Sequence, residues 1–163
     1  MKKARVPSTI CTSLALIAAP ALAEPFPEGC FARDYDTAHL AAHPAQVVSR
    51  MALHLWREND ETLFRIRVRM ADQGHARRDG TAGLTMREEG LCQEPGPCYV
   101  YCDGGGFRLT STSPGAIEIT TEWMRVVQDA PCEGEALVSD LAEVPGQPTT
   151  YRLLASPAAA CAE

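Results

Sequence analysis

Residues 62–70 read TLFRIRVRM, and apolar and polar side chains alternate along this stretch without a break from Phe64 to Met70. Alternation with a period of two is typical of a β-strand, because successive side chains point to opposite faces of a sheet. One face carries Phe64, Ile66, Val68 and Met70, and the other carries Arg65, Arg67 and Arg69. The segment therefore predicts a half-buried strand of an antiparallel sheet, in which one face commonly meets solvent.

The same period recurs along most of the chain. Further strands are predicted at 47–56, 84–87, 99–103, 107–111, 116–121, 123–127, 137–141 and 150–155. Turn-forming pairs lie between them, at Asn59-Asp60, Asp79-Gly80, Pro95-Gly96, Asp103-Gly104, Pro114-Gly115 and Pro145-Gly146. Short strands at this spacing predict an all-β fold, a small antiparallel β-barrel or sandwich of about eight short strands.

One short helix is predicted ahead of these strands. In the stretch DTAHLAAHP, Asp36 has the residue type that caps a helix N-terminus, and Pro44 cannot continue a helix. Residues 24–35, in contrast, are expected to begin as coil, because prolines interrupt the start of this segment. No internal repeat or low-complexity linker divides the chain, so we expect a single domain.

The first 23 residues have the pattern of an export signal. The basic start MKKAR precedes an apolar stretch from Ile10 to Leu22, which ends in the small-x-small sequence ALA at 21–23. We therefore expect a signal peptide at 1–23 and one secreted or periplasmic domain at 24–163. No later segment approaches the roughly 18 consecutive apolar residues of a membrane-spanning helix, so no membrane span is expected.

Six cysteines follow residue 23, and an even number in an exported chain predicts three disulfides. Cys98 and Cys102 would lie roughly 13 Å apart on one side of an extended strand, too far for one bridge. They therefore need different partners. The turn at Pro95-Gly96 brings Cys92 toward Cys98, and Cys30 and Cys161 are the first and last of the six. We predict the bridges Cys92–Cys98, Cys102–Cys132 and Cys30–Cys161.

The composition after residue 23 is strongly acidic. It has 12 arginines, no lysine and 21 acidic residues, a net charge of about −9. Such a surface repels nucleic acid and anionic lipid, so we expect no nucleic-acid partner, and anionic lipid is a poor candidate. We expect a monomer.

The stretch CDGGGF at 102–107 resembles a ligand-binding loop in its glycine content. A phosphate-binding loop needs a lysine and a following helix, whereas a strand follows Gly106 and lysine is absent after residue 23. The stretch is instead predicted to be a β-hairpin turn at Asp103-Gly104. No cofactor motif is found elsewhere, and no cofactor is expected.

His39 and His43 are candidate metal ligands. Their spacing of four places both imidazoles on one face of the expected helix, where they could bind copper, zinc or nickel weakly. A third ligand would have to come from elsewhere, because no HEXXH or similar motif is present. Capping or surface roles are the alternative for this pair.

Arg65, Arg67 and Arg69 are candidate ligand-binding residues. Guanidiniums about 6.6 Å apart on one strand face could bind carboxylates or phosphates. The alternative is a solvated face whose charges pair with acids on neighbouring strands. We call these three residues the arginine strip. The expected partner of the protein is an envelope protein or an anionic envelope ligand.

No complete catalytic motif is present. The sequence lacks GxSxG and SxxK, and the adjacent carboxylates Glu88 and Glu89 would point to opposite faces of a strand. A catalytic site assembled from Ser49 or Ser139 and a histidine distant in sequence is the possibility that remains. We expect a disulfide-stabilised, non-catalytic binding or inhibitor module of the cell envelope. The alternatives are a periplasmic enzyme or a weak metal-binding protein using His39 and His43.

Overall fold

The strand expected at 62–70 forms as β3, and its residues alternate between buried and accessible positions from Thr62 to Met70. The structure is a computed structural model that describes residues 26–94, 96–128, 132 and 137–162. Its elements are β1 (Gly29–Asp34), α1 (Thr37–Ala42), β2 (Val48–Glu58), β3 (Glu61–Met70), α2 (Gly74–Arg78), β4 (Thr85–Cys92), β5 (Pro97–Val100), β6 (Gly105–Ser113), β7 (Ala116–Val127), β8 (Val138–Asp140), β9 (Thr149–Ser156) and α3 (Ala159–Ala162).

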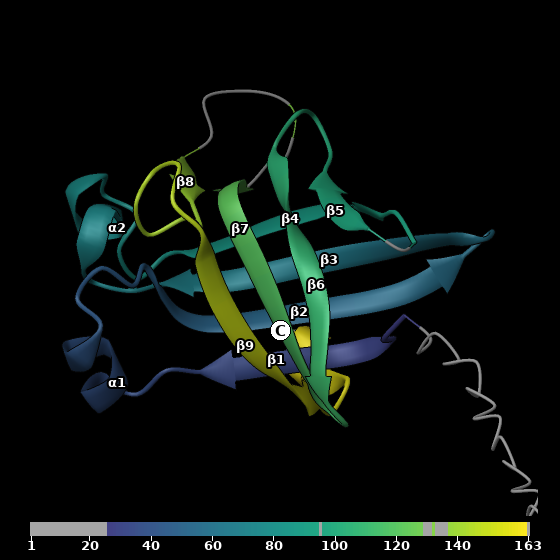
Figure 1. Ribbon diagram of the computed structural model, residues 1–163. Coiled ribbons are helices and arrows are strands. Elements are labelled where there is room, and N and C mark those ends of the chain that lie inside the picture. The colour runs from purple at the N-terminus through teal and green to yellow at the C-terminus, as the bar shows by residue number, and fades with distance from the viewer. Residues whose placement is uncertain (1–25, 95, 129–131, 133–136, 163) are drawn as a thin grey trace, which may run out of the picture.

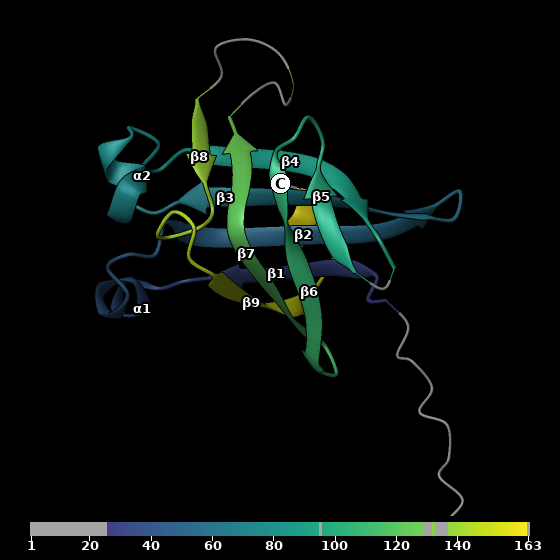
Figure 2. The same ribbon diagram turned by 45° about the horizontal axis from the view of Figure 1, so that its top comes forward.

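Eight of these strands form a closed antiparallel barrel, which settles the choice between barrel and sandwich. Each strand from β1 to β6 pairs with the next one along the chain. β7 pairs with β6 and β9, and β9 pairs with β1, which closes the ring. β8 pairs with β7 alone. In Figures 1 and 2, β6, β7 and β9 cross over β1, β2 and β3, so the barrel has two layers.

The core fills the space between these layers. Its largest fully buried side chains include Phe64, Ile66, Met51, Ile119 and Tyr151, from β2, β3, β7 and β9. The rings of Phe64 and Phe107 meet edge to face, with centroids 5.0 Å apart. The arginines of β3 lie on the outside, as the alternation predicts.

Two hairpin turns form where the sequence predicts them. Asn59 and Asp60 both have positive φ and join β2 to β3, with Glu58 paired to Glu61. Pro114-Gly115 joins β6 to β7, and Gly115 has a φ of 78°. Pro95 of the predicted Pro95-Gly96 turn lies outside the described residues.

The secondary structure differs from the expectation in three places. Residues 26–28 have no regular structure, as expected, but the strand β1 that follows at Gly29 was not predicted, and its Cys30, Phe31 and Ala32 pair with both β2 and β9. The segments 116–121 and 123–127 form one strand, β7, rather than two. The short helix α2 (Gly74–Arg78) was not expected at all, because a five-residue segment shows too little periodicity to detect.

The expected N-terminal helix is confirmed as α1. The carboxylate of Asp36 accepts a hydrogen bond from the backbone N–H of His39 at 2.7 Å, as an N-cap does. The helix ends at Ala42, two residues before Pro44. No residue of α1 is buried, so the helix contributes little to the core.

Three disulfides hold the barrel, with the pairing expected from the sequence: Cys30–Cys161, Cys92–Cys98 and Cys102–Cys132. Cys92 and Cys98 are direct cross-strand neighbours on β4 and β5. Cys30–Cys161 attaches α3 to β1. Paired cysteines are consistent with an oxidising compartment. The expected signal peptide lies outside the described residues, and none of the helices within them is long and apolar enough to cross a bilayer.

Candidate functional site

Two exposed aromatic side chains flank a glycine on three adjacent strands. Tyr99 of β5 pairs with Gly106 of β6, which pairs with Trp123 of β7. Tyr99 is 46% exposed and Trp123 is 53% exposed, although most aromatic surface in a small protein is buried. They line a hollow of about 440 Å³, which we call the aromatic groove, with Pro97, Cys98, Gly105, Gly106, Phe107, Arg108, Thr120, Thr121 and Glu122.

A β-bulge turns Trp123 outward. Gly106 pairs with Trp123 but Arg108 pairs with Thr120, so two residues of β7 oppose Phe107. Before the bulge the odd-numbered residues of β7 are buried, and after it Met124 and Val126 are buried. Without the bulge, the alternation would direct the indole into the core. The local backbone thus exposes an aromatic side chain, and bulges often re-aim side chains near functional sites.

Two of the three consecutive glycines, Gly105 and Gly106, form the floor of the groove. A Cβ on Gly106 would overlap the carbonyl oxygen of Cys98, and a Cβ on Gly105 would overlap the backbone and ring of Trp123. A Cβ on Gly104 would overlap the side chain of Val100. The glycines are therefore required by close packing, and they leave the space between Tyr99 and Trp123 open.

The turn of this hairpin is one residue earlier than the sequence predicts. Tyr99 pairs with Gly106, which places Cys102 and Asp103, not Asp103 and Gly104, at the two turn positions. Both have positive φ, 58° and 56°, as a two-residue hairpin turn of type I′ requires. The Cys102–Cys132 bridge fixes the turn to the segment that follows β7.

An ion pair between the buried Glu88 and the partly exposed Arg125 anchors the hairpin formed by β5 and β6. Glu88 faces the barrel interior with its side chain 0% exposed, and its Oε1 accepts a hydrogen bond from Arg125 Nε at 3.2 Å. Arg125 also donates to the backbone oxygens of Tyr101 and Cys102 at 3.2 and 3.3 Å. Burial raises the pKa of Glu88, and Arg125 opposes that shift. Arg125 thus ties the core to the groove-forming hairpin.

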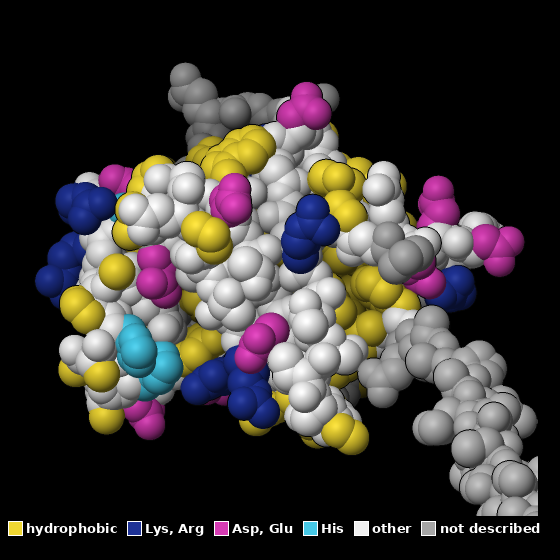
Figure 3. Space-filling model, viewed as in Figure 1, with side chains coloured by type: hydrophobic (Ala, Val, Ile, Leu, Met, Phe, Trp, Pro, Cys, Tyr) yellow, Lys and Arg dark blue, Asp and Glu magenta, His cyan; other side chains and the backbone are white. Residues whose placement is uncertain are grey.

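The groove belongs to a larger exposed apolar surface. Tyr101, Leu137 and Val138 are 43%, 47% and 51% exposed. β8, which carries Val138, pairs with β7 next to Arg125. Figure 3 shows hydrophobic side chains gathered over the upper ends of β6, β7 and β8. Clusters of exposed aromatic residues are typical of binding surfaces.

The arginine strip lies on the outside of β3, but its members have different surroundings. Arg65 forms an ion pair with Glu89 of β4 at 2.6 Å and lies 5.8 Å from the ring centroid of Trp56. Arg67 is half-buried and donates to the backbone oxygen of Ala162 in α3 at 3.2 Å. Arg69 is exposed. The strip is therefore not a row of three equivalent guanidiniums, and its role in ligand binding stays a prediction.

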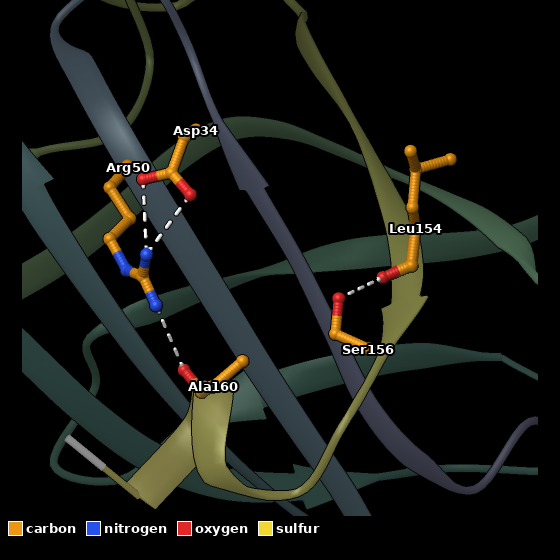
Figure 4. Close-up of polar contacts among 5 residues, drawn as sticks. All are labelled: Asp34, Arg50, Leu154, Ser156 and Ala160. Carbon is orange, nitrogen blue, oxygen red and sulfur yellow. Dashed lines mark hydrogen bonds and ion pairs between the residues drawn. The ribbon is translucent and has the colours of Figure 1, made fainter.

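A neighbouring arginine holds the C-terminal helix against the barrel. Arg50 of β2 donates to both carboxylate oxygens of Asp34 at 3.1 and 3.0 Å, and to the backbone oxygen of Ala160 at 3.3 Å (Figure 4). Ser156, at the end of β9, bonds to the oxygen of Leu154 at 2.9 Å. Arg50 and Arg67 thus both donate hydrogen bonds to α3, whereas the two ends of the arginine strip, Arg65 and Arg69, are exposed. The structure therefore gives part of this cationic face a structural role.

His39 and His43 stack on each other on α1, with ring centroids 4.4 Å apart. The His39 ring also lies 4.9 Å from that of Tyr35, and its Nε2 is 2.9 Å from Gln46 Oε1. Across the described residues, no group of three or more His, Cys, Asp or Glu side chains could hold a metal ion. Among the described residues, the pair thus has no third ligand of the kind a metal site would need. Metal binding by His39 and His43 stays a prediction.

The His39→Ala, His43→Ala double variant should melt within about 5 °C of the wild-type protein, because surface substitutions change stability little. Both residues lie on a helix that buries none of its side chains. Thermal unfolding with and without a chelator measures the effect. A large loss of stability that the chelator reproduces in the wild-type protein would instead indicate a structural metal at this pair.

The surroundings of Ser49 and Ser139 test whether either serine could act in a hydrolytic site. His75, Asp79 and Ser139 line one hollow beside α2, and His75 Nδ1 is 3.4 Å from Asp79 Oδ2. His75 Nε2, however, is 3.1 Å from the backbone oxygen of Ala142, so it is engaged away from Ser139. Ser139 Oγ accepts from Thr81 at 3.5 Å, and Ser49 Oγ donates to the backbone oxygen of Arg69. Neither serine has a histidine as a hydrogen-bond partner among the described residues.

Sequence reasoning missed Tyr99 and Trp123. The only signal was a break in the alternation at Glu122 and Trp123, which led to the prediction of two strands instead of one bulged strand. A bulge depends on pairing with β6, so the sequence of β7 by itself does not reveal which residue it exposes.

Comparison with protein-family models, with curated proteins and with solved structures finds no match to this chain. The candidate site therefore rests on geometry alone.

Proposed function

We propose that this protein is a non-catalytic binding or inhibitor module of the cell envelope, and that it binds its partner through the aromatic groove. The observation that carries this proposal is Trp123, which a β-bulge places on the surface with 53% of its area exposed. Exposed tryptophan and tyrosine residues supply much of the binding energy in protein interfaces. A module that binds, rather than one that catalyses, needs only this rigid surface.

The setting of the groove favours a pre-organised interface. Its glycine floor has no side chains to rearrange, and the Cys92–Cys98 and Cys102–Cys132 bridges anchor the hairpin that forms it. Arg125 adds hydrogen bonds from the core. A rigid surface loses little conformational entropy on binding, which favours affinity. The export signal expected at residues 1–23 and the paired cysteines favour the envelope as the place of action.

The Trp123→Ala variant should bind the envelope partner about 30-fold more weakly, since a central tryptophan contributes about 2 kcal/mol or more. The partner is first captured from an envelope extract with residues 24–163, and its affinity for each variant is then measured by surface plasmon resonance. Trp56→Ala is the matched control, because Trp56 is the other tryptophan and lies on β2, where it stacks on His54. It should bind like the wild-type protein.

The arginine strip provides the competing interface. The Arg65→Glu, Arg69→Glu variant tests it, because both side chains are exposed. If this variant lost binding while Trp123→Ala kept it, and if binding weakened steeply toward 1 M salt, where the screening length is about 3 Å, the strip would be the interface and the groove proposal would be wrong. Unchanged binding by all these variants would contradict both.

A further inference from the structure

A second hollow, of about 300 Å³, lies beside α1. Its charged or titratable side chains come from β1, α1, β7, β9 and the connections on either side of α1 and before β9: Arg33, Tyr35, His39, His43, Glu118, Glu143 and Arg152. In Figure 3, the histidine side chains lie close to a group of basic side chains and an acidic one over β1 and β9. The hollow is independent of the aromatic groove and of the function proposed for it.

The charged groups of this hollow form no close ion pair with each other. Arg50, Arg57, Arg65, Arg77 and Arg125 each form an ion pair elsewhere in the protein. Among the described residues, no ion pair within 4.0 Å includes Arg33 or Arg152, or either of the two glutamates. Arg33 instead lies over the ring of Tyr35, 4.7 Å from its centroid. Glu118 of β7 and Arg152 of β9 are direct cross-strand neighbours that form no ion pair within 4.0 Å. Two cations and two carboxylates thus share one hollow without a close ion pair between them.

Glu143 is the most costly of these groups to leave without a counter-charge. It is half-buried, and its burial raises its pKa, a shift that His39 and His43 oppose. An unpaired carboxylate that has lost part of its hydration destabilises the fold, so its presence here needs a reason. Burial also raises the pKa of the neighbouring Tyr35 to about 12, which keeps its hydroxyl neutral.

Hydrogen bonds hold the backbone on two sides of the hollow. The backbone N–H of Glu143 donates to Thr149 Oγ1 at 2.9 Å, and Tyr151 donates to the oxygen of Leu141 at 2.8 Å. On the other side, Gln46 is 2.9 Å from His39 and donates to the oxygen of Val48 at 2.7 Å. Its charged side chains are therefore mounted on a fixed frame, as a binding site requires.

We propose that this hollow binds a small zwitterion of the α-amino acid class, with its carboxylate toward Arg33 and Arg152 and its ammonium group toward Glu118 and Glu143. A simple anion would leave both glutamates uncompensated and be repelled by them, and a simple cation would meet the same problem at the arginines. A ligand with both charges neutralises both sets. Guanidinium pairs with carboxylate in bidentate geometry, and the volume is at the lower end of small-molecule sites, which begin at about 300 Å³.

Isothermal titration calorimetry with residues 24–163 tests this proposal. The twenty common amino acids are titrated one at a time up to 10 mM, with acetate and methylammonium as ligands that carry only one of the two charges. At least one amino acid should bind, and acetate and methylammonium should each bind at least tenfold more weakly. Acetate binding as tightly as the best amino acid would show a simple anion site, and no binding by any amino acid would show that the hollow is not a site. Either result overturns the proposal.

Three variants localise the effect. Arg152→Gln and Glu143→Gln each remove one charge with little change of shape, and each should weaken binding of the same amino acid at least tenfold. Arg78→Gln is the matched control, because Arg78 is an exposed arginine on α2 and does not line the hollow; it should bind like the wild-type protein. Unchanged melting temperatures identify variants that are folded. Equal weakening by all three variants would mean that net charge, not this hollow, governs binding, and would contradict the proposal.

Discussion

Replacing Cys30 and Cys161 together by alanine should lower the free energy of unfolding by about 5 kcal/mol, the largest loss that we expect from any change in this protein. The bridge joins residues 131 apart, and the loop entropy that a disulfide removes from the unfolded chain grows with the length of the loop. Urea unfolding measures the loss. The denaturant slope should increase as well, because the unfolded chain becomes less compact without the bridge.

The matched control is the Cys92→Ala, Cys98→Ala variant, because that bridge closes a loop with a separation of only 6 residues. Loop entropy alone predicts a loss of about 2 kcal/mol for so short a loop. A loss as large as that of the Cys30–Cys161 variant, with no difference in denaturant slope, would show that the bridges act by local packing rather than through the unfolded chain.

Replacing Arg125 by methionine should lower the free energy of unfolding by about 3 kcal/mol, because removing one member of a buried ion pair leaves the other charge uncompensated. Glu88 would remain inside the barrel with its side chain 0% exposed. The hairpin at Tyr101 and Cys102 would also lose two hydrogen bonds. The change should therefore weaken partner binding at the aromatic groove in addition to destabilising the fold.

The pH dependence of this loss has a definite sign. Burial raises the pKa of Glu88 and Arg125 opposes that shift, so the pKa should rise further when Arg125 is removed. A carboxyl group with a raised pKa in the folded state stabilises the fold below its unfolded pKa of about 4.3, and this contribution is lost as the pH rises through the folded pKa. The difference between variant and wild type should thus be small near pH 4 and grow toward pH 7.

The Arg125→Met, Glu88→Gln double variant is the matched control for that mechanism. Without a charge on residue 88, most of the lost stability at pH 7 should return, because the amide has no charge to desolvate. Chemical unfolding at several pH values separates the alternatives. A loss that is independent of pH and is not restored by Glu88→Gln would assign the effect of Arg125 to the hairpin hydrogen bonds alone.

Much of the fold follows from local patterns in the sequence. The alternation in β3, the cap at Asp36 and the turn residues Asn59-Asp60 each act over a few residues, and each element forms where the sequence predicts it. The Cys92–Cys98 bridge also follows from a local pattern, because a turn-forming pair separates the two cysteines. Such features are readable because their energies depend on neighbours in sequence.

β1 is a strand that local sequence patterns do not predict. Its buried residues Phe31 and Ala32 are covered because β1 lies between β2 and β9, and β9 is more than 100 residues away in the chain. The sequence near the N-terminus holds no trace of that pairing. Strand assignment there depends on a long-range contact, which overrides the weak local preference.

By itself, then, the sequence determined the β-rich class, the helix cap, most turns and the Cys92–Cys98 bridge, because strand period, turn chemistry and a six-residue disulfide loop are local properties. The two longer bridges were predicted from the order of the remaining cysteines. Only the tertiary structure decided which side chains meet. The β6–β7 register exposes Trp123 and places it one strand away from Gly106 and two from Tyr99. Barrel closure brings Arg33, Glu143 and Arg152 to one hollow beside α1. The aromatic groove needs the register of three successive strands, β5, β6 and β7, whereas the hollow beside α1 exists only after the barrel has closed.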